Sequence, residues 1–141
     1  KNIVYVEDDP INARLMTDII DRMSNHHLEI ARTGKEGLQL IFENRPDLVL
    51  LDLNLPDMDG YQILEQIRAD PKTRKIPAIA MTAKAMMADV ERGARAGFDD
   101  YIVKPVRAAE ILKSIELVQP RENMDTHQPG DFGVGPAQVI E

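Results

Sequence analysis

Short apolar runs alternate along this chain with longer amphipathic stretches, and the alternation repeats five times between residues 1 and 118. The two clearest runs are Ile3–Val6 and Leu48–Leu51, and a third covers Ile76–Met81. Two weaker runs, Leu28–Ala31 and Tyr101–Val103, complete the set. Runs that are apolar at every position are typical of strands that are covered on both faces, as in parallel sheets.

The stretches between these runs carry apolar residues at helical spacing. Ile11, Leu15 and Ile19 lie four residues apart, which predicts a helix from about Pro10 to Ser24. Asp9 is expected to cap this helix, because a carboxylate accepts the unpaired amide hydrogens of a first helical turn. Four more helices are predicted around Leu38, Ile41 and Phe42, around Ile63, Leu64 and Ile67, from about Lys84 to Ala96, and around Ile111, Leu112, Ile115 and Val118. Strands and helices in this order indicate an open parallel α/β sheet with right-handed crossovers.

The composition narrows the classes of protein. The chain of 141 residues has 17 Lys and Arg against 24 Asp and Glu, a formal net charge of −7. This balance argues against direct nucleic-acid binding through a broad basic face and against docking on an anionic membrane. No apolar run is long enough to span a bilayer, and the absence of cysteine excludes disulfides and thiolate metal sites. We therefore expect a cytoplasmic protein.

The last residues differ from the rest of the chain. Residues 119–141 contain three prolines and three glycines, little periodicity, and one arginine against four acidic residues. We expect one domain over residues 1–118, followed by a flexible tail or linker over residues 119–141. Because the sequence begins at Lys1 rather than at methionine, both a stand-alone domain and a piece trimmed from a longer protein are considered.

Polar residues follow four of the five predicted strands, at the end where open α/β sheets bind ligands. Glu7 and Asp8 follow the first strand, Asp52 ends the third, Thr82 ends the fourth, and Lys104 follows the fifth. Three carboxylates at one edge repel each other, since two unit charges about 4 Å apart cost roughly 4 kcal/mol at a protein surface. Such a cluster either holds a proton or binds a cation.

The donor atoms in this cluster favour a hard cation. Oxygen ligands without nearby Cys or His select an ion such as Mg²⁺, which keeps several waters and therefore leaves room for a phosphoryl group. Taken singly, two of these residues have a simpler structural interpretation: Thr82 could cap the following helix, and Lys104 could be a solvated loop residue. Asp52 has no such simple interpretation, since an ionised group after four apolar strand residues needs a partner. Pro56, Asp57 and Gly60 are interpreted as turn residues.

Four segments in this order, VYVEDDP, LVLLDLNLPDMDGYQIL, IPAIAMTAKA and DDYIVKP, resemble the receiver (CheY-like) domain of two-component response regulators. The resemblance covers residues 1–118, and the intervals of 44, 30 and 22 residues that separate Asp8, Asp52, Thr82 and Lys104 agree with it. It implies a flavodoxin-like (βα)5 fold, a doubly wound five-stranded parallel sheet with strand order 2-1-3-4-5. It also implies a role in phosphorelay signal transduction.

The resemblance implies a role for each matching residue. Asp52 would be the nucleophile that accepts a phosphoryl group. Asp8 would bind Mg²⁺ directly and Glu7 through water, while Asp52 and the backbone carbonyl of Asn54 complete the protein ligands, with Mn²⁺ as a substitute ion. Lys104 would pair with the phosphoryl oxygens.

Further positions would act in switching and in the lifetime of the phosphorylated state. Thr82 would hydrogen-bond a phosphoryl oxygen, and Tyr101 would then move inward with it. A cis peptide bond before Pro105 would aim the preceding lysine at the site. Asn54 and Lys84, two positions past Asp52 and Thr82, would tune the phosphate lifetime.

The expected partners follow from the same resemblance. A histidine kinase or a histidine phosphotransfer protein would donate the phosphoryl group. A downstream protein would bind the face formed by the fourth helix, fifth strand and fifth helix, and a second copy of the chain is a further expected partner after phosphorylation. The domain would catalyse only its own phosphorylation and dephosphorylation, and so would not be an enzyme in the usual sense.

Two other functions are considered. The first is an aspartyl-phosphate phosphohydrolase similar to the haloacid dehalogenases, which place a second Asp two positions after the nucleophile. In this chain that position holds Asn54, and 141 residues leave no room for a cap domain. The second is a receiver-shaped binding module that is never phosphorylated, although Asp52, Thr82 and Lys104 are all present.

Overall fold

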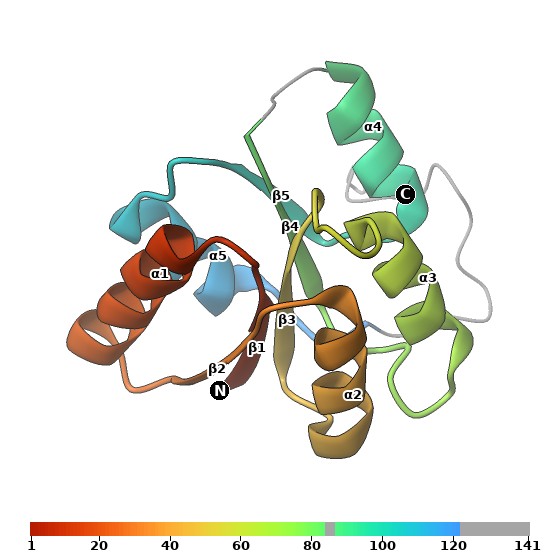
Figure 1. The fold of residues 1–141 in the computed structure, drawn as a ribbon, viewed down its shortest axis with the longest axis horizontal. Helices are drawn as coiled ribbons and strands as arrows, with labels where there is room; N and C mark the ends of the chain where they lie inside the picture. The colour runs from red at the N-terminus through yellow and green to blue at the C-terminus, as the bar shows by residue number, and fades with distance from the viewer. Residues whose placement is uncertain (84–86, 122–141) are drawn as a thin grey trace.

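Strands and helices alternate from end to end of the computed structural model, which describes residues 1–83 and 87–121 (Figure 1). The strands are β1 (Asn2–Val6), β2 (His27–Ala31), β3 (Leu48–Asp52), β4 (Ala78–Thr82) and β5 (Asp100–Val103). The helices are α1 (Pro10–Met23), α2 (Gly34–Asn44), α3 (Gly60–Ala69), α4 (Met87–Ala96) and α5 (Ala108–Leu117). The predicted alternation is therefore confirmed.

The five strands form one parallel sheet in the order β2-β1-β3-β4-β5. Helices α1 and α5 cover one face of this sheet, and α2, α3 and α4 cover the other (Figure 1). This is the predicted flavodoxin-like arrangement. The order reverses between β1 and β3, and in open α/β sheets such a switch point is where ligands bind, beyond the carboxyl ends of the strands.

The core has two parts, one on each face of the sheet. The side chains of each strand alternate between the faces, so that each strand contributes to both parts. On the α1/α5 face the fully buried residues include Tyr5, Met16, Ile20, Leu50 and Ile115. On the other face they include Val6, Ile41, Leu51, Leu64 and Phe98. Within the described ranges, no helix combines the length and the apolar character that are needed to cross a membrane.

Local sequence, together with one tertiary contact, explains where α1 and β4 begin. Asp9 caps α1, because its Oδ1 accepts the amide hydrogen of Ile11 at 2.9 Å, as predicted. Strand β4 begins at Ala78, two residues later than the apolar run predicts. The reason is that Pro77 has no amide hydrogen to donate to the sheet, and the amide of Ala78 is bonded to the side chain of Asp99 at 2.9 Å.

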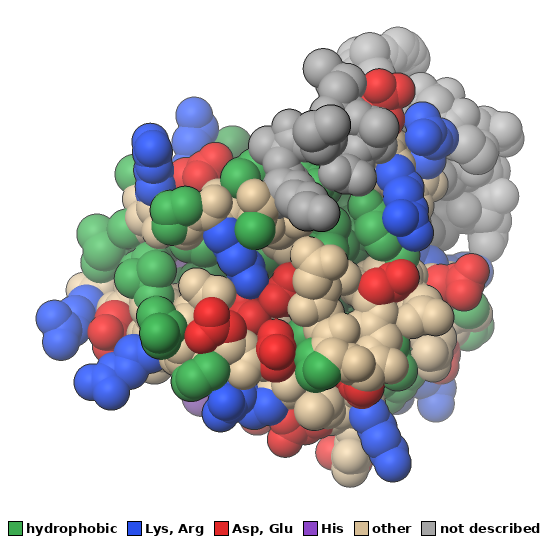
Figure 2. All heavy atoms as spheres, turned by 45° about the horizontal axis from the view of Figure 1, so that its top comes forward, with side chains coloured by type: hydrophobic (Ala, Val, Ile, Leu, Met, Phe, Trp, Pro, Cys, Tyr) green, Lys and Arg blue, Asp and Glu red, His purple; other side chains and the backbone are tan. Residues whose placement is uncertain are grey.

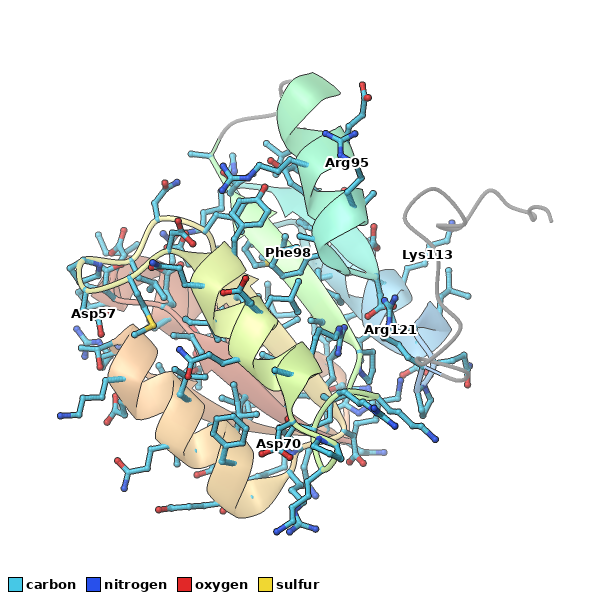
Figure 3. The ribbon with its side chains drawn as sticks, turned by 90° about the vertical axis from the view of Figure 1, so that its right-hand side faces the viewer. Asp57, Asp70, Arg95, Phe98, Lys113 and Arg121 are labelled. Carbon is cyan, nitrogen blue, oxygen red and sulfur yellow. The ribbon has the colours of Figure 1, made fainter. Side chains whose placement is uncertain are left out.

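The described chain continues past α5 to Arg121, which is held against the domain. Its guanidinium Nη1 donates to Asp99 Oδ1 at 2.8 Å and to the carbonyl of Gly97 at 3.0 Å, below the carboxyl end of α4 (Figure 3). Its amide donates to the carbonyl of Lys75 at 2.8 Å. Arg121 thus packs on the domain, and the predicted boundary at residue 118 stays a prediction, since residues 122–141 lie outside the described ranges.

Candidate functional site

Strand register brings the predicted site residues to one edge of the sheet. Val6 pairs with Leu51, so Glu7 lies level with Asp52, the last residue of β3. Because side chains alternate, Glu7 and Asp52 point to the same face as Tyr5, the face that α1 and α5 cover. The carboxylates therefore form the polar end of the apolar core on that face.

Lys104 joins the two buried carboxylates. Its Nζ lies 2.6 Å from Glu7 Oε1 and 3.1 Å from Asp52 Oδ2. The side chain of Glu7 is 0% exposed and that of Asp52 is 6% exposed. Figure 2 shows acidic side chains gathered on the face where the strands end, with a basic side chain beside them.

Asp8 completes a cluster of oxygen donors. Carboxylate oxygens of Glu7, Asp8 and Asp52 all lie within 4.8 Å of one another. The second oxygen of Asp52, Oδ1, accepts the amide hydrogen of Asn54 at 3.0 Å, which fixes the orientation of this carboxylate. Three carboxylates balanced by one lysine leave excess negative charge, and a hard divalent cation fits such an all-oxygen set.

The ionisation of the cluster reflects its burial. Burial raises the pKa of Glu7 above its ordinary value, and the neighbouring carboxyl of Asp52 adds to this effect. Burial lowers the pKa of Lys104, but its hydrogen bonds to Glu7 and Asp52 outweigh that effect and leave this pKa raised. The charged form of Lys104 is therefore stabilised, whereas burial disfavours the charged form of Glu7. A nearby cation would stabilise the ionised Glu7 carboxylate.

Thr82 and Tyr101 lie on the other side of the sheet edge. Together with Asn54 they line a cavity of about 210 Å³, whose other lining residues are Leu53, Asp59, Tyr61 and Arg92. The guanidinium of Arg92 lies 3.9 Å from the centre of the Tyr61 ring. The Thr82 side chain is buried, whereas Tyr101 is half-buried. The structure thus places both predicted switch residues in one cavity beside the loop that follows Asp52.

The segment after β5 and the lifetime positions complete the set of predicted residues. The peptide bond between Lys104 and Pro105 is cis, and the Lys104 amide donates to the carbonyl of Thr82 at 2.6 Å. Asn54 is exposed in the loop after β3, where it pairs with Asp59 in an isolated β-bridge. Lys84 lies outside the described residues.

Sequence reasoning missed three residues at or near this edge. Tyr5 donates its hydroxyl hydrogen to Glu7 Oε1 at 2.8 Å, and the two-residue spacing on a predicted strand was the available signal. Asp57, taken as a turn residue, accepts the amide hydrogens of Gly34 at 2.8 Å and Lys35 at 3.0 Å at the start of α2 (Figure 3). Arg32 donates to the carbonyl of Asp8 at 3.3 Å. Nothing local in the sequence indicates the contacts of Asp57 and Arg32.

Comparison with known proteins identifies the family. The family described as the response regulator receiver domain matches residues 3–116. The chain is 37% identical over 116 residues to the polar-differentiation response regulator DivK of Brucella anthropi, a match that covers 82% of this chain and 94% of DivK. The chain therefore belongs to the response regulator receiver domain family, whose members act in phosphorelay signalling.

Solved structures agree with this assignment. One is the receiver domain of the sensor histidine kinase PA1611 from Pseudomonas aeruginosa, with a magnesium ion coordinated in its active site cleft. It is 31% identical with a TM-score of 0.75, over 82% of this chain and 94% of that one. The response regulator Rcp1 in its Mn²⁺-bound form is 27% identical with a TM-score of 0.72, over 86% of this chain and 99% of that one. These similarities favour neither the phosphohydrolase nor the unphosphorylated binding module.

Proposed function

We propose that Asp52 accepts a phosphoryl group from a phosphohistidine on a histidine kinase or a histidine phosphotransfer protein. The observation that carries this proposal is the placement of Asp52, buried at the sheet edge with Lys104 Nζ at 3.1 Å and two further carboxylates within 4.8 Å. Phosphoryl transfer depends mainly on positioning and on charge neutralisation, which this set of side chains is arranged to provide.

The cation of the site would be Mg²⁺, with Mn²⁺ as a substitute. Asp8 and Asp52 would bind it directly, Glu7 through a water, and Asn54 through its backbone carbonyl. When bound, the ion supplies positive charge that offsets the negative charge of the phosphoryl group. The magnesium and manganese ions held by PA1611 and Rcp1 support this choice of metal.

The chain's own residues position and balance the transfer. A carboxylate oxygen of Asp52 forms a bond to phosphorus while the bond from phosphorus to the imidazole nitrogen of the donor breaks. The Asn54 amide holds the Asp52 carboxylate in one orientation during this step. Lys104 neutralises the incoming oxygens, because a phosphoryl group carries roughly −1.5 to −2 charges in place of the −1 of the free carboxylate.

The change of charge at Asp52 would switch a binding surface. Thr82 would hydrogen-bond one phosphoryl oxygen, and Tyr101 would turn toward the cavity that the two residues share. The surface that changes is the one formed by α4, β5 and α5. A hollow on this surface, lined by residues that include Arg107, Glu110 and Lys113, supports the binding of a downstream protein there.

The remaining finer assignments belong to the same proposal. The domain acts in the cytoplasm, turns over no external substrate, and binds neither nucleic acid nor membrane directly. Phosphorylation promotes association with a second copy of the chain. Asn54 and Lys84 set how long the phosphoryl group stays on Asp52.

The test is phosphorylation by a small donor. Acetyl phosphate with Mg²⁺ should add one phosphoryl group to the native protein, seen by intact-mass spectrometry, and chelation of the metal should abolish the reaction. The Asp52→Asn variant should stay unmodified. If that variant is phosphorylated to the same extent as the native protein, Asp52 is not the acceptor.

A further inference from the structure

Tyr5 connects the apolar core to the acidic site. It lies in the middle of β1 and is 0% exposed, with its ring in the core on the α1/α5 face. Its hydroxyl nevertheless reaches the sheet edge and donates to Glu7 Oε1 at 2.8 Å. None of the roles assigned above uses this hydroxyl, and a tyrosine with a wholly packed ring has no freedom to turn toward another partner.

The hydroxyl shares its acceptor with Lys104. Glu7 Oε1 receives both the Tyr5 hydroxyl and Lys104 Nζ, the latter at 2.6 Å. The other oxygen, Oε2, receives the amide hydrogen of Asp9 at 3.2 Å. Lys104 is itself divided between Glu7 and Asp52, so these contacts form one connected network.

A phosphoryl group on Asp52 would compete for one member of this network. It brings three strong acceptor oxygens next to Lys104, which would turn from Glu7 toward them. A fully buried carboxylate that loses a charged donor is costly unless other donors remain. The Tyr5 hydroxyl and the Asp9 amide already donate to Glu7, and both would stay with it when Lys104 turns away.

We propose that Tyr5 is a positioning residue for the switch: its hydroxyl holds Glu7 in place when Lys104 leaves it for the phosphoryl group. This inference rests on the proposed function, because it needs Lys104 to bind the phosphoryl oxygens. It predicts that without the hydroxyl, Lys104 is held more tightly by Glu7 and the phosphorylated arrangement is weakened. The arrangement before phosphorylation changes little, because Lys104 still satisfies Glu7.

The test compares Tyr5→Phe with the native protein and with a matched control. Phenylalanine keeps the buried ring and removes the hydroxyl alone. The control is Thr73→Val, which removes another buried hydroxyl, one that donates to the carbonyl of Ile67 at 2.8 Å and takes no part in the site. Calorimetric titrations measure two affinities: that of the metal-free protein for Mg²⁺, and that of the Mg²⁺-saturated protein for beryllofluoride, a mimic of the phosphoryl group.

The expected result is a split between the two affinities. Tyr5→Phe should bind beryllofluoride at least five-fold more weakly, which corresponds to about 1 kcal/mol, while its Mg²⁺ affinity stays within two-fold of native. Thr73→Val should keep both affinities. Equal beryllofluoride binding by Tyr5→Phe would overturn the inference, and so would a parallel loss of both affinities, which would make Tyr5 a general support of the site. Failure of the native protein to bind beryllofluoride would instead overturn the proposed function.

A second measurement needs no variant. The hydroxyl hydrogen of Tyr5 is buried and bonded, so proton nuclear magnetic resonance should detect it in slow exchange with water. We expect this signal to persist, with exchange no faster, when Mg²⁺ and beryllofluoride are added. Loss of this signal on binding would show that the Tyr5 hydroxyl leaves Glu7 when Lys104 does, which contradicts the proposed role. This measurement decides the question even if Tyr5→Phe does not fold.

Discussion

Replacing Lys104 with methionine tests the electrostatics of the site most severely. Methionine keeps an apolar stem of similar length and removes the charge that lies 2.6 Å from Glu7 and 3.1 Å from Asp52. The two carboxylates are 0% and 6% exposed, so water cannot replace the lost partner. Removing one member of a buried ion pair costs about 3 to 5 kcal/mol. We expect the lower end, about 3 kcal/mol, because the site is at the edge of the sheet.

Such a loss is large against the total stability of roughly 5 to 15 kcal/mol for a domain. The assay is urea unfolding followed by far-ultraviolet circular dichroism, since the chain has no tryptophan to serve as a fluorescent probe. Lys113→Met is the matched control, because Lys113 is exposed on α5 and its replacement should leave the free energy of unfolding nearly unchanged.

Magnesium gives the second arm of this experiment. The ion would supply part of the positive charge that Lys104→Met removes, so saturating Mg²⁺ should raise the stability of the variant by more than that of the native protein. The reasoning is refuted if the variant matches the native protein without Mg²⁺. It is also refuted if Mg²⁺ stabilises both proteins by the same amount.

Three further predictions follow from other contacts. Burial raises the pKa of Glu7 above its ordinary value of 4.5, so the stability it contributes in metal-free protein is complete below pH 4.5 and is lost as the pH rises through the raised pKa. Urea titrations should therefore show Glu7→Gln gaining stability relative to native above pH 4.5, and a difference that does not vary with pH would contradict this. Arg121→Ala removes the hydrogen bonds to Asp99 and Gly97, so the free energy of unfolding measured in urea should fall by about 1 to 2 kcal/mol. An unchanged urea midpoint would show that these bonds do not contribute to stability. In Gly60→Ala the new Cβ would lie 2.8 Å from the carbonyl oxygen of Asp52. The variant should therefore be less stable by about 1 to 3 kcal/mol, seen as a lower melting temperature in thermal denaturation. Melting at the native temperature would contradict this clash.

The parts of the fold that rest on local pattern were predictable. The runs Ile3–Val6 and Leu48–Leu51 are apolar at every position, which predicts central strands covered on both faces. Both runs are buried throughout in the structure. Asp9 caps its helix through a contact two residues away, which a sequence motif captures. The apolar run predicts a start of β4 two residues early, because apolar character alone does not show that Pro77 lacks an amide hydrogen.

The candidate site was predictable as a set of residue types, but its connections were not. That carboxylates and a lysine meet at one edge follows from parallel strands ending together. That Lys104 bridges Glu7 and Asp52, and that Tyr5 shares the same oxygen, depends on register and packing, which one sequence does not reveal. Arg121 escaped prediction for the same reason, because its partner Asp99 is brought close only by the tertiary fold.

The central claim is that Asp52 carries the phosphoryl group, and chemical mapping of the modified residue tests it most directly. The native protein is phosphorylated with acetyl phosphate and Mg²⁺ and reduced with borohydride, which converts an acyl phosphate on aspartate to homoserine. It is then digested, and its peptides are sequenced by mass spectrometry. The account predicts homoserine at position 52 and nowhere else. Homoserine at Asp8 or at another aspartate, with residue 52 unchanged, would contradict it.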